Sequence, residues 1–181
     1  LREVLALARL KGMAVIEEVS PEHSRPVLDT VSRVAARLIR PGDDLLSHAE
    51  IHQLGAWLPG LPLSDSSHDG LVTSTPELLR ARGERVFLEL LRRTASRQPL
   101  VIALDDAQWM DAESVTVLGR VYRELVAPRE EAAGDRGDAL ALIVSLRAED
   151  RGAEHLKPLQ KLIAAGTVAQ IQLGAFTAEE T

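Results

Sequence analysis

The spacing of apolar residues along the chain predicts helices that alternate with strands. An apolar residue at every third or fourth position indicates a helix with one buried face, and a short continuous apolar run indicates a strand buried on both faces. The expected helices cover residues 1–12, 26–40, 47–58, 75–98, 111–126 and 158–165. The expected strands cover residues 13–19, 100–105, 139–146 and 168–173. Strands joined by helices predict parallel pairing, and the fold class is therefore an α/β three-layer sandwich.

The helical stripes define the candidate core. They comprise Leu1, Val4, Leu5 and Ala8; Val27, Val31, Val34, Leu38 and Ile39; Ile51, Leu54 and Leu58; Val86, Phe87, Leu90 and Leu91; and Val115, Leu118, Val121, Tyr122 and Leu125. Local chemistry marks the helix ends. Gly12 accepts a left-handed C-terminal position, residues 47–50 form a capping box, Thr75 precedes a proline at the first helical position, and Asp111 is a strong N-cap.

The chain is expected to form a single domain that is cut at both ends. With 181 residues, 45% of them apolar, it is long enough for one core. Residues 59–75 and 127–138 are rich in loop-forming residues and are expected to be loops. The sequence begins inside an amphipathic helix at Leu1, and residues 177–180 form a capping box with no helix after it.

Composition excludes several classes of function. A formal net charge of −6 and an aromatic content of 3% argue against direct nucleic-acid binding by this segment. No apolar run approaches the roughly 20 residues of a membrane span. The absence of cysteine removes thiolate metal sites and cysteine nucleophiles and favours a reducing compartment, so we expect a cytoplasmic protein without membrane contact.

Two adjacent aspartates, Asp105 and Asp106, end the most apolar strand, LVIALD. In a parallel sheet ligands lie at the carboxyl ends of strands, and adjacent anions repel unless a cation or hydrogen-bond donors stabilise them. One carboxylate can hold a metal ion while the other orients water. The alternative is that Asp106 or Asp111 only caps the following helix. A prenyl-transferase aspartate motif fits less well, because those aspartates lie on long helices.

A second candidate site follows the next apolar strand, at Ser145 and Arg147. Arginine at that edge can bind a phosphate with two parallel hydrogen bonds. The alternative is a surface arginine paired with Glu149 or Asp150.

Other motifs are weaker or absent. His48 and His52 are four residues apart, but Glu50 between them does not fit a zincin, and an exposed helical face explains them. The chain has neither a G-x-S-x-G elbow nor a GxxxxGK[ST] phosphate loop, and its lysines, Lys11, Lys157 and Lys161, lack the glycine context.

The segment PLVIALDDAQWMDAESVTVLGRV resembles the Walker B strand and following helix of the STAND class of P-loop ATPases, which are signal-transduction ATPases with an AAA-like module. Asp105, Asp106, Trp109 and Asp111 fill the positions of that pattern, and Ser145-Leu-Arg147 resembles the nucleotide-sensing end of the next strand. QLGAFTAEE is similar to the segment after the family's last strand. The resemblance is strongest over residues 82–181.

The resemblance implies a P-loop NTPase fold that lacks its first strand, with Leu1 lying just after a Walker A motif. It implies ATP and Mg²⁺ as cofactors, with Asp105 holding the metal ion, Asp106 activating water, and Arg147 with Ser145 contacting nucleotide. It further implies slow hydrolysis, a role as a switch, partners among other domains of the same polypeptide, and nucleotide-dependent self-association. Transcription regulators, kinases and cyclases carry such modules. The alternative is a pseudo-ATPase that acts as an interaction scaffold.

Overall fold

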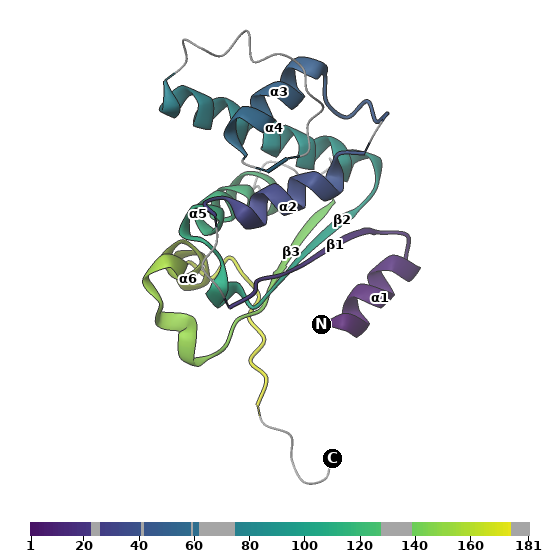
Figure 1. Cartoon of the computed structure of the whole chain (residues 1–181). Coiled ribbons are helices and arrows are strands. Elements are labelled where there is room, and N and C mark those ends of the chain that lie inside the picture. Colours follow the sequence, from purple (N-terminus) through teal and green to yellow (C-terminus); the bar gives the residue numbers. More distant parts are fainter. Residues whose placement is uncertain (23–25, 41, 59, 62–74, 128–138, 175–181) are drawn as a thin grey trace.

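The computed structural model describes residues 1–22, 26–40, 42–58, 60–61, 75–127 and 139–174. The predicted loops at 59–75 and 127–138 lie almost entirely outside the described residues, and so does the predicted capping box at 177–180. The described residues form a mixed α/β structure (Figure 1).

Helices separate the three described strands along the chain. The helices are α1 (Arg2–Leu10), α2 (Asp29–Leu38), α3 (His48–Trp57), α4 (Pro76–Arg97), α5 (Ala112–Val121) and α6 (Lys157–Ala164), and the strands are β1 (Ala14–Val19), β2 (Leu100–Asp105) and β3 (Leu140–Val144). Three of the helices, α2, α3 and α4, lie between β1 and β2. Short helical turns are η1 (Ala107–Trp109), the π-helical turn η2 (Tyr122–Val126), η3 (Glu149–Gly152) and η4 (Glu154–Leu156).

The three described strands form one parallel sheet in the order β1, β2, β3. Val19 of β1 pairs with Asp105 of β2, and Leu104 pairs with Val144 of β3. All three strands therefore end at the same edge of the sheet. This arrangement confirms the predicted parallel pairing of an α/β fold.

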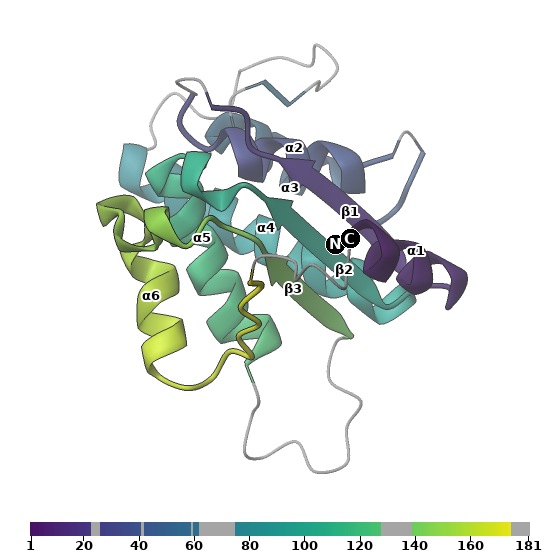
Figure 2. The ribbon, with the colours of Figure 1, turned by 90° about the horizontal axis from the view of Figure 1, so that it is seen from below.

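Helices cover both faces of the sheet (Figures 1 and 2). On one face Leu5 and Ala8 of α1 pack against Val101 and Ala103 of β2. On the other face Leu100, Ile102 and Leu104 of β2 belong to a larger cluster that includes residues of α2, α4 and α5. The alternation along β2 places successive side chains on opposite faces, which is why a strand of continuous apolar residues is buried there. The edge strand β3 is less covered, and Ala141 is exposed.

The helix ends follow the predicted local chemistry. Ser47 and Glu50 form the complete capping box of α3, and the Thr75 side chain accepts a hydrogen bond from the N–H of Leu78, at 3.4 Å, at the start of α4. Gly12, which follows the C-cap Lys11 of α1, has a φ of 77°, in the left-handed region that glycine accepts. These ends depend on residues close in sequence, so the sequence alone is enough to locate them.

Three expectations are wrong. No strand forms over residues 168–173, where Ile171 is 85% exposed and Leu173 is 89% exposed. The second helix starts at Asp29, not 26, and Val27 is 59% exposed. Leu1 and Val4, predicted to lie on the buried face of the first helix, are 40% and 57% exposed, and only Leu5 and Ala8 of that stripe are buried.

Candidate functional site

Asp105 and Ser145 meet at the carboxyl edge of the sheet. Asp105 is the last residue of β2, and Ser145 directly follows β3. The Ser145 hydroxyl donates a short hydrogen bond to Asp105 Oδ1. The Ser145 N–H donates to the carbonyl of Leu104, at 2.9 Å, so the sheet pattern continues into the site and fixes Ser145 beside the aspartate.

Asp106 has an unusual backbone conformation. Its φ of 55° and ψ of 47° place a residue other than glycine in the left-handed region, and such residues often lie at functional sites. Its N–H points at the Oγ of Ser145, at 3.3 Å, and at Oδ1 of Asp105, at 3.2 Å. The turn after β2 therefore holds both carboxylates at the end of the strand.

Gln108 joins the two candidate segments, and the sequence analysis missed it. Its Nε2 donates to Asp106 Oδ1 at 2.9 Å, and its Oε1 accepts from the Arg147 N–H at 3.3 Å. Gln108 is 5% exposed. The sequence feature that could have indicated Gln108 is a polar residue between two apolar ones in the run DDAQWMD, where the chain after β2 is buried again.

Arg147 is exposed, and its guanidinium has no hydrogen bond or ion pair with any residue that the structure describes. The predicted alternative, pairing with Glu149 or Asp150, is therefore absent among those residues. The structure brings the backbone of Arg147 to the aspartates through Gln108. It does not bring the guanidinium there. A free cation beside this edge can bind an anion without first breaking an ion pair.

Asp111 caps α5, as one of the sequence alternatives predicted. Its Oδ1 accepts from the Ser114 N–H at 2.8 Å and from the Leu28 N–H at 2.9 Å. Leu28 immediately precedes α2 and has a φ of 65°. Asp111 therefore caps α5 and also binds the residue before α2. It is not part of the Asp105–Asp106 pair.

The oxygen atoms of Asp105 and Ser145 suit a hard cation. Mg²⁺ prefers oxygen ligands and is often held by only one or two carboxylates, with water and substrate phosphates completing its shell. A group of three histidine, aspartate or glutamate side chains placed to bind a metal occurs nowhere in the described ranges. Asp105 and Ser145 thus offer only a partial set of oxygen ligands, and the described residues do not form a complete protein cage for a metal ion.

The histidine pair on α3 shows no metal geometry. The rings of His48 and His52 lie 5.6 Å apart and are tilted. Glu50 between them is engaged elsewhere, because it accepts hydrogen bonds from Ser47 and from Arg93 of α4. These hydrogen bonds account for a glutamate at position 50, because it belongs to the capping box of α3.

A buried charge cluster connects β1 to α2 near the same edge. Glu18 is 3% exposed and forms ion pairs with Arg33, at 3.3 Å, and with Arg37. Arg33 also donates to the carbonyl of Val19, at 3.2 Å. A buried carboxylate with two cationic partners is well compensated, so the cluster needs no ligand to explain it.

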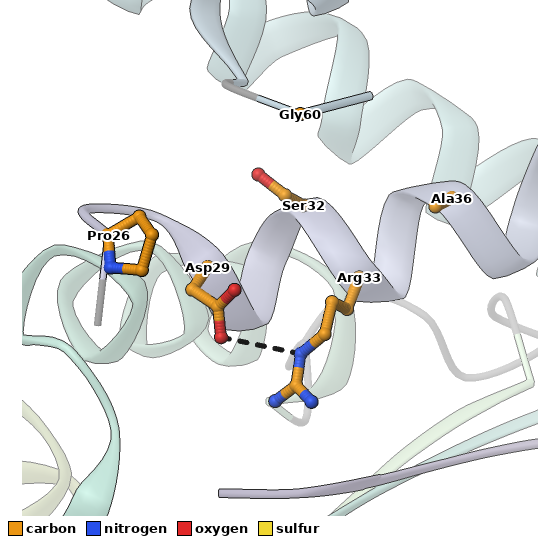
Figure 3. Close-up of a pocket in the computed structure, with 6 residues that line it drawn as sticks. All are labelled: Pro26, Asp29, Ser32, Arg33, Ala36 and Gly60. Atoms are coloured by element: carbon orange, nitrogen blue, oxygen red, sulfur yellow. Dashed lines mark ion pairs between the residues drawn. The ribbon is translucent and has the colours of Figure 1, made fainter. Parts of the chain in front are cut away.

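Arg33 also lines a pocket of about 270 Å³ beside α2, together with Pro26, Asp29, Ser32, Ala36 and Gly60 (Figure 3). The Asp29 and Arg33 side chains form an ion pair of 3.4 Å on its wall. The pocket includes none of the four candidate residues predicted from the sequence.

In the described part of the chain, every helix is too short or too polar to cross a membrane. No protein-family model, no curated protein and no solved structure matches the chain.

Proposed function

We propose that the chain is an ATP-binding, slowly hydrolysing switch module of the P-loop type, with the STAND class as its model, and that it works in the cytoplasm. The observation that carries the proposal is the meeting of Asp105, Asp106 and Ser145 at the carboxyl ends of adjacent parallel strands. The guanidinium of Arg147, two residues after Ser145, has no partner among the residues that the structure describes. That edge is where α/β sheets bind ligands.

Each side chain has a distinct role in the proposal. Asp105, oriented by the Ser145 hydroxyl, would hold Mg²⁺ together with the nucleotide phosphates. Bound Mg²⁺ supplies positive charge that offsets the charge of the β- and γ-phosphates. Asp106 would accept a proton from the attacking water or orient it. Arg147 would contact the terminal phosphate, which is present in ATP and absent from ADP.

In this proposal the module acts as a switch, because Arg147 would contact ATP and ADP differently. A ligand shifts a conformational equilibrium only by its differential interaction with the two states. The Arg147 guanidinium, which has no partner among the described residues, would gain hydrogen bonds with ATP, whose terminal phosphate ADP lacks. The proposed output is therefore a change in how this module contacts other domains of its polypeptide or a second copy of itself.

Binding of ATP tests the proposal. We would measure ATP affinity with and without Mg²⁺, using the 181-residue chain and, in parallel, the same chain with any coding sequence upstream of Leu1. Asp105→Ala should weaken the Mg²⁺-dependent binding about tenfold or more, since a charge-assisted contact is worth about 1.5–3 kcal/mol. Asp44→Ala, the same change at an exposed aspartate that pairs with Arg97 of α4, is the matched control.

A second candidate function is a scaffold that binds no nucleotide. It is favoured by one observation, the lack of a GxxxxGK[ST] motif in the 181 residues. No ATP binding by either folded chain would support this alternative and leave Asp105 and Asp106 with a structural role. Binding that is equally strong without Mg²⁺, or unchanged in Asp105→Ala, would contradict the proposed role of Asp105.

A further inference from the structure

The side-chain amide of Gln108 makes two contacts that only one orientation permits. Its Nε2 lies 2.9 Å from Asp106 Oδ1, and its Oε1 lies 3.3 Å from the Arg147 nitrogen. Turning the amide over would place two acceptors together at Asp106 and two donors together at Arg147. The amide is therefore locked, and it connects a carboxylate after β2 to the backbone after β3.

The backbone around Gln108 is fixed as well. The N–H of Ala107 donates to the carbonyl of Ser145, at 2.9 Å, and a ring nitrogen of His155 lies 3.0 Å from the carbonyl of Gln108. Both Ala107 and Gln108 are buried. A side chain held at its base and at both ends of its amide can keep a neighbouring carboxylate in one direction.

We infer that Gln108 is a positioning residue, which holds the Asp106 carboxylate by Oδ1 and links it to the segment that carries Arg147. The inference rests on the proposed function, since it assigns Gln108 a task in that site. With Oδ1 occupied, Asp106 has Oδ2 to accept a hydrogen bond from water. Gln108 touches neither nucleotide nor water in this role and acts only through Asp106.

This role has a kinetic signature. Binding of nucleotide depends on Asp105 and Arg147, whereas the direction of Asp106 matters only when water attacks. Loss of the Gln108 amide should therefore lower turnover and leave affinity almost unchanged. A residue that only stabilised the fold would lower the melting temperature and would not separate turnover from affinity.

The test uses Gln108→Met, which keeps the length of the side chain and removes both hydrogen bonds. We would measure single-turnover hydrolysis of MgATP, the MgATP dissociation constant and the melting temperature, in the chain that binds MgATP. Turnover should fall about tenfold or more, within the range that general-base catalysis contributes, and the dissociation constant should change less than about threefold. Ser114→Ala is the matched control, because it removes a buried hydrogen bond, to the N–H of Val31, away from the site.

A double-mutant cycle decides whether Gln108 acts through Asp106. In an Asp106→Asn background, Gln108→Met should cause little further loss of turnover, because the residue it positions is already disabled. Gln108→Glu retains the size and the acceptor toward Arg147 but loses the donor toward Asp106. It should lower turnover as well, and it serves if the methionine variant does not fold.

The possible results separate the two proposals. Normal turnover in both folded Gln108 variants, or a full additional loss on top of Asp106→Asn, would overturn the positioning role while the ATPase stands. A wild-type chain that binds no MgATP would overturn the proposed function and the role of Gln108 with it.

Discussion

Trp57 of α3 packs directly on the backbone of Gly83 in α4. A Cβ added at Gly83 would lie 2.4 Å from the Trp57 Cβ and 2.5 Å from its Cγ. The two helices approach each other closely only because position 83 has no side chain, and the indole also lies near the ring of Phe87, with ring centres 6.4 Å apart.

Gly83→Ala should therefore destabilise the protein, although alanine is the better helix former by about 1 kcal/mol. Overpacking costs about 1–3 kcal/mol, so after the gain of about 1 kcal/mol in helix propensity we expect a net loss of up to about 2 kcal/mol in the free energy of unfolding. Urea unfolding measures it. Gly119→Ala in α5 is the control, because its new Cβ would be 3.4 Å from the nearest atom, on Pro158, and should cost little or stabilise. Equal effects at both positions would contradict the close packing of Trp57.

Removing the Asp111 side chain should lower the free energy of unfolding more than removing a helix cap that makes a single contact. Asp111→Ala deletes the acceptor for Ser114 N–H and for Leu28 N–H together, and the sum of a lost cap and an unsatisfied amide is about 2–4 kcal/mol. Thr75→Ala removes a cap with a single contact, and we expect about 0.5–1 kcal/mol. Thermal or urea unfolding of both variants compares them, and similar losses would show that the bond to Leu28 adds nothing.

Acid should weaken the capping box at the start of α3 and, to a smaller extent, its contact with α4. Hydrogen bonds from the N–H and the hydroxyl of Ser47, followed by the guanidinium of Arg93, lower the pKa of Glu50 from 4.5 to about 2. The folded state thus binds fewer protons than the unfolded state, and the stabilisation is complete above pH 4.5 and lost as the pH falls toward 2. Glu50→Gln keeps an acceptor for Ser47 but has no charge.

Unfolding free energies of wild type and Glu50→Gln, measured from pH 7 to pH 2, test this directly. The difference between them should be constant above pH 5 and should shrink between pH 4.5 and pH 2. A difference that does not depend on pH would mean that the Glu50 charge contributes nothing to the folded state.

Arg147→Ala should reduce the preference for ATP over ADP. The guanidinium would contact only the terminal phosphate, and hydrogen bonds to a charged group are worth about 1.5–3 kcal/mol, or about tenfold or more in affinity. The measurement is the ratio of the two dissociation constants. Arg151→Ala, a nearby surface arginine bonded to Gln170, is the control, and an unchanged ratio in Arg147→Ala would remove Arg147 from the nucleotide site.

The sequence was sufficient where structure depends on neighbouring residues or on a simple period. The capping box at Ser47 and Glu50 and the cap at Asp111 were predicted because each needs only residues three positions away. The parallel sheet followed from apolar strands separated by helices, and it placed Asp105 and Ser145 at one edge. The roles of these two residues remain predictions.

The sequence was insufficient to predict features that depend on contact with a residue far away in the chain. Residues 168–173 have the composition of a strand, but a strand also requires a neighbouring backbone to bind, and in the described residues none pairs with Ile171 or Leu173. Gln108 was missed for the same reason. Its contact with Arg147 joins residues 39 positions apart, and no local pattern encodes that distance.

The register between β2 and β3 has a consequence for how the chain can vary. Leu104 pairs with Val144, so the next positions along are Asp105 and Ser145, which lie side by side. Side chains alternate between faces, so one residue inserted or deleted within either strand would move one of the two to the opposite face. Substitutions can tune this site gradually, whereas a change of one residue in strand length would abolish it in a single step.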